Sequence, residues 1–399
     1  MTFNIKCTSK KVRISDICEV FDGPHATPKK TQSGPIYLGI DSITDDGHIN
    51  PSGYNHLSSE DYAIWTKRVV PQENDLVFTY EATLGRYALI PKAFCGCLGR
   101  RVALLRIKDN KVNPRWLLYY FLSSEWKTFI DSRTVIGSTV NRIPIKAFPD
   151  YEILLPPIET QNNIATILGN IDDHIEINKR INDNLSQQAL GIFTRMFAAS
   201  ESTIPATIAD VSLNVTDGVH NTVHDDPNGQ YLLLSCKNIK GGSLSISKCE
   251  RRINQETFEK LRRRTKLAKG DVLISSVGTV GELMLLNTDP VNYEFQRSVA
   301  IVKPNSKIVS SSYLYSALMS KRAELINAAH GAVQQCLFIS DIAGFPVNIP
   351  SPSSLQKFDS LVVPMFDNIS NNEAENAQLA MLRDTLLPRL MTGEIDISK

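Results

Sequence analysis

The side chains best suited to chemistry in this sequence are basic and amide groups that recur at matching places in its two halves. A D-G-x-H-x-T stretch at residues 22–27 is followed by Lys29 and Lys30, and a second copy of the stretch lies at residues 217–222. Basic groups bind DNA phosphates, whereas Asn, Gln, Arg, Ser and Thr also form hydrogen bonds with base edges. These residue types therefore indicate a nucleic-acid surface.

The candidate DNA-binding residues come from both copies of this stretch, from a basic run near residue 263, and from two loops at residues 138–142 and 331–335. Arg100 and Arg297, which match in the two halves, and Arg86 complete the set. The candidates are His25, Thr27, Lys29, Lys30, Arg86, Arg100, Ser138, Thr139, Asn141, Arg142, His220, Asn221, Thr222, Arg262, Arg263, Arg264, Arg297, Gln334 and Gln335. A simpler interpretation stays open for several of them. The basic run could be the solvated face of a helix, and the two histidines could stabilise their own turns.

Motifs that would indicate catalysis are weak. Asn113-Pro114-Arg115-Trp116 resembles the N-P-P-aromatic loop of amino-methyltransferases, but Arg115 replaces the second proline and no glycine-rich cofactor loop precedes it. Pro149-Asp150 could begin a nuclease motif, yet no E-x-K follows at usable spacing. Neither G-x-x-x-x-G-K-[ST] nor H-E-x-x-H occurs, and the seven histidines and seven cysteines lack metal-ligand spacing. We expect neither a catalytic residue nor a metal site in this chain.

The two halves of the chain form an internal repeat at an offset near 195. Asn74-Asp75-Leu76-Val77 matches Gly270-Asp271-Val272-Leu273, and Thr83-Leu84-Gly85 matches Thr279-Val280-Gly281. Short β-type runs separated by turns occur in both halves, with one or two helices between them. Each half is therefore predicted to contain an α/β or α+β domain with a mixed or antiparallel sheet.

A long helix is predicted after each domain, the first from Pro156 to Phe197 and the second in the C-terminal stretch. Their apolar residues recur at heptad spacing, which favours pairing of the two helices. The first stripe is Ile164, Ile167, Leu168, Ile171, Ile175, Ile181, Leu185, Ile192 and Met196. The second is Phe358, Leu361, Val362, Met365, Ile369, Leu379, Leu382, Leu386 and Leu390.

Polar residues and a proline interrupt these stripes. Asn178, Asn372 and Asn376 lie on or beside them, where they are either solvated edge positions or side chains that set the register of the pair. Pro364 predicts a bend or a restart in the second helix, because an interior proline removes a backbone hydrogen bond and costs about 3 kcal/mol.

The predicted order is domain (1–155), helix (156–200), domain (201–350), helix (351–399). If the helices pack antiparallel as a coiled coil, an approximate two-fold axis relates the two halves, as in dimeric DNA readers. The composition, 42% hydrophobic and 21% charged with a net charge of +1, is ordinary for a globular protein. No apolar run approaches 18 residues, and the N-terminus has no signal-peptide pattern, so we expect a cytoplasmic protein without membrane contact.

Several of these motifs together resemble the specificity subunits of type I restriction-modification systems. They are the doubled D-G-x-H-x-T loop, the doubled Asp-aliphatic strand followed by T-x-G, the P-P-x-x-x-Q stretch at Pro156, Pro157 and Gln161, and the tail L-L-P-R-L-M-T-G-E-I at residues 386–395. The resemblance covers nearly the whole chain. One departure is Pro350-Ser351-Pro352, which stands where the first copy has its double proline.

This resemblance implies two target recognition domains, each reading one half of a split site in double-stranded DNA. It also implies that the paired helices bind two modification subunits, and that restriction subunits join the complex. S-adenosylmethionine, ATP and Mg would then belong to those partners, and this chain would hold no cofactor. Two rival hypotheses are a DNA methyltransferase or nuclease with an unrecognised active site, and a coiled-coil protein-protein adaptor. The first predicts methylation by the isolated chain, and the second predicts no preference for a DNA sequence.

Overall fold

The computed structural model describes residues 9–137, 140–197, 203–219, 222–247, 249–331, 335–395 and 397. The chain divides into two compact units, of which unit 1 comprises Met1–Glu176 with Ala377–Lys399 and unit 2 comprises Ile177–Asn376. Two long helices, α6 (Ile158–Phe197) and α11 (Pro352–Thr392), each contribute one part to unit 1 and the other part to unit 2.

Unit 1 is built on a four-stranded antiparallel sheet with the strand order β2-β8-β5-β6. A second sheet, β4-β3-β7, pairs β3 with β7 in parallel, and a ribbon joins β1 to β9. The strands are β1 (Lys10–Arg13), β2 (Cys18–Asp22), β3 (Thr31–Leu38), β4 (Asn55–His56), β5 (Leu76–Thr79), β6 (Tyr87–Leu89), β7 (Gly96–Leu98), β8 (Val102–Ile107) and β9 (Glu152–Leu155). The helices are α2 (Ile14–Ile17), α3 (Ser59–Trp65), α4 (Pro114–Leu122) and α5 (Ser124–Arg133), with 3-10 turns η1 (Ile40–Ser42), η2 (Pro51–Gly53) and η3 (Phe148–Asp150).

Local sequence explains where these elements begin. β5 is buried along its whole length, and Asp75 just before it accepts a hydrogen bond from the Gln72 backbone and pairs with Arg106 at 2.6 Å. The carboxylate thus closes the turn that leads into a core strand. Asn113 caps α4 by accepting from the backbone N–H groups of the next turn, with Pro114 in the first helical position. The Asn113-Pro114 pair is therefore a helix start and not a cofactor loop.

Unit 2 repeats the four-stranded sheet, the three-stranded sheet and the first ribbon of unit 1 in the same strand orders, and has one further ribbon. Its four-stranded antiparallel sheet is β11-β19-β16-β17, its three-stranded sheet is β15-β12-β18, and its ribbons are β10-β20 and β13-β14. The strands are β10 (Ile204–Thr207), β11 (Ser212–Asp217), β12 (Tyr231–Leu234), β13 (Ile239–Lys240), β14 (Ser243–Leu244), β15 (Arg252–Ile253), β16 (Val272–Ser275), β17 (Leu283–Leu285), β18 (Tyr293–Phe295), β19 (Val299–Pro304) and β20 (Pro346–Ile349). The helices are α7 (Gln255–Thr265), α8 (Ser311–Ser320), α9 (Arg322–Asn327) and α10 (Ile339–Ala343), with the 3-10 turn η4 (Cys236–Asn238).

The repeat seen in the sequence extends to single backbone positions. Asp271 before β16 accepts from the Ala268 backbone and pairs with Lys303, as Asp75 does with its partners in unit 1. Gly85 and Gly281, the last residues of the two T-x-G motifs, both adopt the left-handed region, with φ of 71° and 84°. This conformation favours glycine, which explains the residue type at both places.

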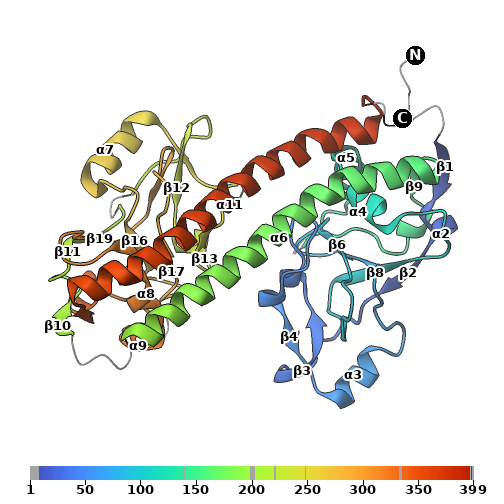
Figure 1. Cartoon of the computed structure of the whole chain (residues 1–399). Coiled ribbons are helices and arrows are strands. Elements are labelled where there is room, and N and C mark those ends of the chain that lie inside the picture. The colour runs from blue at the N-terminus through green and yellow to red at the C-terminus, as the bar shows by residue number, and fades with distance from the viewer. Residues whose placement is uncertain are drawn as a thin grey trace. The chain divides into compact units, whose positions relative to one another are not determined.

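In each unit the two long helices lie side by side and antiparallel (Figure 1). In unit 2 the Nδ2 group of Asn178 donates to Oδ1 of Asn376 at 3.0 Å, and Nδ2 of Asn372 donates to Oδ1 of Asn182 at 2.8 Å. In unit 1 Arg383 pairs with Asp172 at 2.9 Å. Two of the predicted asparagines, Asn178 and Asn376, therefore bind each other, whereas Asn372 binds Asn182, which the sequence analysis did not name.

The structure contradicts part of the predicted apolar stripes and the restart expected at Pro364. Ile181, Leu361 and Leu382 are between 41% and 48% exposed, so these members of the predicted stripes do not lie inside the seam. The second helix also does not restart at Pro364, because α11 runs unbroken through it. Pro364 has no N–H group to donate to the Ser360 carbonyl four residues earlier. Both residues are exposed, so water can donate to that carbonyl instead.

Candidate nucleic-acid interface

Four loops of unit 1 meet at one end of its four-stranded sheet. The Gly23 N–H, just after β2, donates to the Val102 carbonyl at the start of β8 at 3.1 Å. Tyr80, just after β5, donates its N–H to the Arg101 carbonyl at 3.1 Å and accepts from the Ile143 N–H at 2.8 Å. These bonds bring the D-G-x-H-x-T loop, the T-x-G loop, residues 99–101 and the loop at residues 135–142 together.

The equivalent loops of unit 2 meet through equivalent hydrogen bonds. Gly218 donates to the Val299 carbonyl at 3.1 Å, Ser276 donates its N–H to Ser298 at 2.9 Å, and Leu337 donates to the Ser276 carbonyl at 2.8 Å. The sequence predicted these segments as separate candidates, and the structure makes them neighbours within each unit.

Close backbone contact explains the glycine of the D-G-x-H-x-T loop. A Cβ atom on Gly23 would lie 2.3 Å from the Val102 carbonyl oxygen, and one on Gly218 would lie 2.1 Å from the Phe295 carbonyl oxygen. Neither distance is possible for a side chain, so only glycine lets the loop pack on the segment before β8 or β19. The motif therefore has a structural role as well as any role in binding.

Most of the described candidate residues expose their side chains. The exposed ones are His25, Thr27, Lys29, Lys30, Arg100, Asn141, Arg142, Thr222, Arg263, Arg264, Arg297 and Gln335. Ser138, Thr139, His220, Asn221 and Gln334 lie outside the residues that the structure describes. Of the exposed residues, His25 does contact its own turn, because its Nε2 is 3.2 Å from Oδ2 of Asp22.

Three candidate arginines already bind other parts of the protein. Arg86 pairs with Asp45 at 2.8 Å, and Arg262 pairs with the fully buried Glu294 beneath α7. Arg264 donates to Oδ1 of Asp217 at 2.9 Å and to the Gly218 carbonyl at 2.8 Å. These guanidinium groups stabilise the loops. Lys29, Lys30, Arg100, Arg263 and Arg297, which form no ion pair with a described residue, are better placed to meet phosphates.

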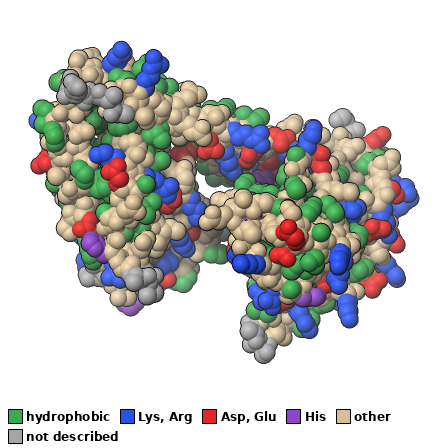
Figure 2. Space-filling model, turned by 90° about the horizontal axis from the view of Figure 1, so that it is seen from below, with side chains coloured by type: hydrophobic (Ala, Val, Ile, Leu, Met, Phe, Trp, Pro, Cys, Tyr) green, Lys and Arg blue, Asp and Glu red, His purple; other side chains and the backbone are tan. Residues whose placement is uncertain are grey.

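Charge at this end of each sheet is mixed. In unit 1 Arg101 faces Glu81 at 3.3 Å, and burial together with the nearby Asp22 carboxylate raises the pKa of Tyr80 above its usual value. Figure 2 shows Lys and Arg side chains in several separate groups with acidic side chains between them, and the described residues on that face form no continuous basic strip. Recognition by such loops depends on individual side chains more than on a uniform positive surface.

Three residues beside these loops were missed by sequence analysis. Trp65, Lys67 and Arg68 lie at or just after the end of α3 and line a pocket with the first D-G-x-H-x-T loop. The repeat contains the signal that would have found them, because residues 58–74 align without a gap on residues 254–270 at an offset of 196. That alignment places Arg68 opposite Arg264, a residue already in the candidate set.

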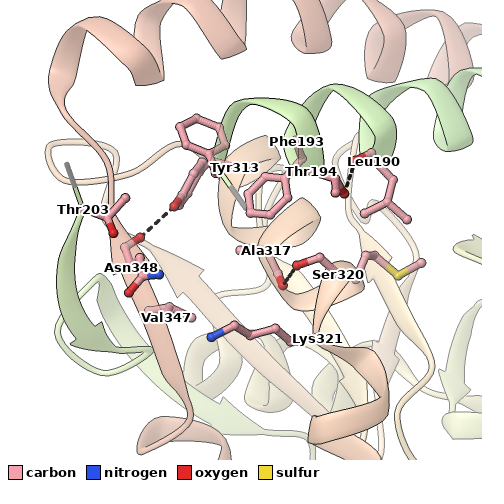
Figure 3. Close-up of a pocket in the computed structure, with 12 residues that line it drawn as sticks. Leu190, Phe193, Thr194, Thr203, Tyr313, Ala317, Ser320, Lys321, Val347 and Asn348 are labelled. Atoms are coloured by element: carbon pink, nitrogen blue, oxygen red, sulfur yellow. Dashed lines mark hydrogen bonds between the residues drawn. The ribbon is translucent and has the colours of Figure 1, made fainter. Parts of the chain in front are cut away.

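A second cavity, of about 440 Å³, lies in unit 2 between the end of α6, α8 and β20 (Figure 3). Phe193 and Leu190 form its apolar side, and the Tyr313 hydroxyl donates to the Asn348 carbonyl at 2.8 Å across one end. The described residues that line it include no carboxylate, histidine or cysteine. Its Thr194, Ser320 and Lys321 side chains donate to the backbone carbonyls of Leu190, Ala317 and Pro346, so none of the three is paired with a general base.

The described residues contain no cluster of three or more His, Cys, Asp or Glu side chains that could hold a metal ion. None of their helices is long and apolar enough to cross a membrane.

Comparison with known proteins agrees with this geometry. A family model described as the type I restriction modification DNA specificity domain matches residues 7–187. The MjaIX specificity subunit of a type I restriction enzyme from Methanocaldococcus jannaschii is 25% identical, over 97% of this chain and 93% of that protein. The EcoBI specificity subunit from Escherichia coli is 23% identical, over 75% of this chain and 69% of that protein. The S subunit of a type I restriction-modification system from M. genitalium has a similar fold, with a TM-score of 0.50, 16% identity and 96% of each chain covered.

Duplicated sheet domains joined by two long packed helices, with exposed basic and amide loops, define a DNA-recognition protein without a catalytic centre of its own. The similarities in sequence and fold support a specificity subunit of a type I restriction-modification system. The predicted family, the α/β fold class and the DNA-specificity function are confirmed. In this family the cofactors reside in the modification and restriction subunits.

Proposed function

We propose that this chain reads a split DNA site in the cytoplasm, with one domain on each half-site, and that its helices bind two modification subunits to which restriction subunits are added. The observation that carries the proposal is the loop cluster that occurs in both units. The backbone that supports the cluster is the same in each, whereas the side chains that it exposes differ. Two loop clusters with a similar backbone and different exposed side chains suit two half-sites of different sequence.

The proposed domain boundaries are residues 1–155 and 201–350 for the two target recognition domains, and 156–200 and 351–399 for the helices. The proposed DNA contacts are the exposed candidate residues, with Arg86, Arg262 and Arg264 acting mainly to hold the loops. Because the phosphate contacts are few and local, we expect binding that weakens with salt and depends on sequence.

Exposed apolar side chains on the helices are the proposed contacts for modification subunits. Ile177 and Ile181 on α6 are 54% and 41% exposed, and Met381 and Leu382 on α11 are 71% and 48% exposed. Exposed side chains of this size on a long helix are typical of a surface that another protein covers.

A domain exchange tests the proposal. Replacing residues 1–155 with the corresponding domain of another specificity subunit should change one half of the methylated sequence and leave the other half intact. Sequencing the methylated genome of cells that carry the complete system, before and after exchange, measures both halves. A change in both halves would contradict independent reading by two domains.

Two biochemical assays separate this proposal from its rivals. The purified chain, incubated with DNA and labelled S-adenosylmethionine, should transfer no methyl group, and incorporation of label would support a methyltransferase instead. With modification subunits present, the complex should prefer one split sequence over a scrambled duplex at physiological salt. Equal affinity for both would support an adaptor role.

A further inference from the structure

Two oppositely charged side chains lie together inside the loop cluster of unit 1. Nε of Arg101, just before β8, is 3.3 Å from Oε1 of Glu81, two residues after β5, and the two side chains are 28% and 25% exposed. The sequence analysis named neither residue. Exposed candidate residues flank the pair, because Arg101 follows Arg100 in the chain and Glu81 forms a β-bridge with Arg142.

The backbone at Arg101 has a conformation that an arginine does not favour. The Val102 N–H donates to the Gly99 carbonyl at 3.3 Å, which closes a β-turn over residues 99–102. Arg101 is the third residue of this turn and has a φ of 71°. A turn with a positive φ at its third residue is type II, where glycine or asparagine is usual because a Cβ atom crowds the backbone. Arginine at this place therefore costs free energy that glycine would not.

Unit 2 forms the equivalent turn without a left-handed residue. The Val299 N–H donates to the Gln296 carbonyl at 3.1 Å, and Ser298 stands at the third position. Ser298 is not among the described residues whose φ is positive. By contrast, Ala82, just before the T-x-G motif of unit 1, has a φ of 67° and matches Gly278, with a φ of 82°, so that turn belongs to the shared fold. The strained arginine is therefore particular to unit 1.

Two hydrogen bonds hold the strained turn in place. The Arg100 N–H donates to the hydroxyl of the buried Tyr37 at 2.7 Å, and the Tyr80 N–H donates to the Arg101 carbonyl at 3.1 Å. Strained residues that their surroundings hold in this way cluster at binding and catalytic sites. A side chain that is fixed before binding also loses less conformational freedom when it meets a ligand. The turn therefore points to a binding role for Arg101.

The polar ends of the two side chains are free to bind a ligand. Apart from the contact between them, neither the Arg101 guanidinium nor the Glu81 carboxylate forms a hydrogen bond or ion pair with a described residue. Nε of Arg101 is buried, but its two terminal nitrogens and both oxygens of Glu81 do not belong to the buried polar atoms that lack a partner in the described part of the chain. These atoms therefore reach the molecular surface.

We propose that Arg101 and Glu81 read one G·C base pair, in the major groove, within the half-site that unit 1 binds. The inference rests on the proposed function, which assigns a half-site to unit 1. The guanidinium donates to O6 and N7 of guanine, and the carboxylate accepts from the N4 amino group of cytosine. Guanine O6 and cytosine N4 are neighbours in one base pair, so these contacts require a guanidinium beside a carboxylate, as the 3.3 Å contact provides.

An A·T base pair does not fit the same two side chains. Adenine presents an N6 amino donor where guanine has O6, and thymine presents the O4 acceptor where cytosine has its amino group. The guanidinium would then face a donor and the carboxylate an acceptor, so both contacts become repulsive. Unit 2 has the uncharged Val277 and Ser298 at the equivalent positions, so this reading is expected only in the half-site of unit 1.

Base analogues test the proposal. The complete complex of this chain with its modification subunits is bound to duplexes that carry its own methylated sequence, with 7-deazaguanine, which lacks the N7 acceptor, in place of one guanine at a time. At one position in the half-site read by unit 1, the analogue should weaken wild-type binding about tenfold. Arg101→Gly should bind the unmodified site about tenfold more weakly, and 7-deazaguanine at that position should weaken its binding no further.

Three variants separate a reading role from a structural role. Arg101→Gly suits the positive φ, so its melting temperature should not fall, although its preference for G·C over A·T at that position should be lost. Arg101→Lys should keep the charge, and with it the sequence-independent affinity, but should lose most of the preference because lysine lacks the planar fork. Glu81→Gln, which can donate to thymine O4, should discriminate less against A·T. Lys92→Ala, at an exposed turn beyond the other end of β6, is the matched control and should behave as the wild type.

The outcomes distinguish this inference from the proposed function. The inference is wrong if no guanine of the unit 1 half-site is sensitive to the analogue, or if Arg101→Gly remains as sensitive as the wild type. It is also wrong if Arg101→Gly lowers the melting temperature while the base preference stays unchanged, because the side chain would then be structural. Each of these results leaves the proposed function in place. Loss of all sequence preference in the wild-type complex contradicts the proposed function itself.

Discussion

Arg263 and Arg264 are neighbours on α7, yet their guanidinium groups have different environments. Arg264 binds the D-G-x-H-x-T loop through Asp217 and Gly218. Among the residues that the structure describes, the side chain of Arg263 bonds only the Glu259 carbonyl of its own helix, at 3.3 Å. A basic run in a sequence is therefore not one functional unit. One of these residues stabilises the loop, and the other is available to DNA.

We expect opposite effects when each of the two arginines is truncated. Arg264→Ala should lower the free energy of unfolding of unit 2 by about 1–3 kcal/mol, because it removes a charged donor from the partially buried Asp217 carboxylate and from the Gly218 carbonyl. Arg263→Ala should change the free energy of unfolding by less than about 0.5 kcal/mol. It should lower DNA affinity, and it should reduce the slope of the logarithm of affinity against the logarithm of salt concentration by about one. Urea denaturation and binding at several salt concentrations measure both. Equal losses of stability would contradict the separation of roles.

Glu250 should make the stability of unit 2 depend on pH. Burial acts to raise the pKa of Glu250, but donors that include Lys237 at 3.0 Å and Ser247 at 2.8 Å outweigh it and lower the pKa from 4.5 to about 2. The folded state therefore binds the proton less readily than the unfolded state. The stability from this group is fully present above pH 4.5 and is lost as the pH falls toward 2.

Glu250→Gln should therefore reduce the free energy of unfolding on the order of 2 kcal/mol at neutral pH. The difference from wild type should shrink between pH 4.5 and pH 2, because the wild-type carboxylate becomes protonated there. Urea titrations at a series of pH values measure this convergence. Glu324→Gln, at an exposed position of α9 in the same unit, is the matched control and should follow the wild type throughout. A difference that stays constant with pH would refute the assignment.

At the scale of elements, the long helices combine buried apolar side chains with polar contacts between them. Ile164, Leu168, Phe358 and Val362 are at most 1% exposed, whereas Asn178 is also buried, at 4%, and binds Asn376 and Glu375. A polar pair inside a helix seam usually lowers stability but specifies the register. Heptad spacing alone does not distinguish such a position from a solvated edge, so both interpretations remained open until the helix partners were known.

Replacing both Asn182 and Asn372 with Leu should raise the melting temperature of unit 2, because two hydrogen-bonded amides give way to apolar contacts. The same change should loosen the register of the helices, since alternative apolar pairings then cost less. Thermal unfolding measures the first effect, and binding to sites with a series of spacer lengths measures the second. Asn184→Leu, at an exposed position of α6, is the control and should change neither. A lower melting temperature with unchanged spacer tolerance would contradict this role.

At the scale of the whole molecule, the proposal makes the helices the element that sets the spacer between half-sites. Deleting residues 179–185 of α6 together with residues 369–375 of α11 removes seven residues around the Asn182–Asn372 pair from each helix. This is nearly two helical turns, or about 10 Å of rise, so the remaining faces stay aligned. DNA rises about 3.4 Å per base pair, so the preferred spacer should shorten by about three base pairs.

Methylome sequencing of cells carrying the deletion variant measures the spacer directly. The two half-site sequences should remain the same, because the deletion touches neither loop cluster. An unchanged spacer would show that the helices do not set it. Deleting seven residues from α6 alone is the informative control, since it shifts the register and should impair methylation of every site.

Much of the fold was predictable because it depends on local pattern. The heptad spacing predicted both long helices, and the matching motifs predicted two similar domains. The errors came from treating each apolar or basic position as equivalent. Ile181, Leu361 and Leu382 fit the spacing but are exposed, and Pro364 is tolerated because the carbonyl it leaves unpaired faces water.

The sequence by itself determined which residue types recur, and thereby the duplicated domains, the helices and the family to which the chain belongs. Only the tertiary structure decided which of these side chains already have a partner. Arg68 and Arg264 occupy the same position of the repeat, but Arg264 binds a loop 46 residues earlier and Arg68 binds nothing that the structure describes. Contacts between segments so far apart depend on how the whole domain packs, which local periodicity does not encode.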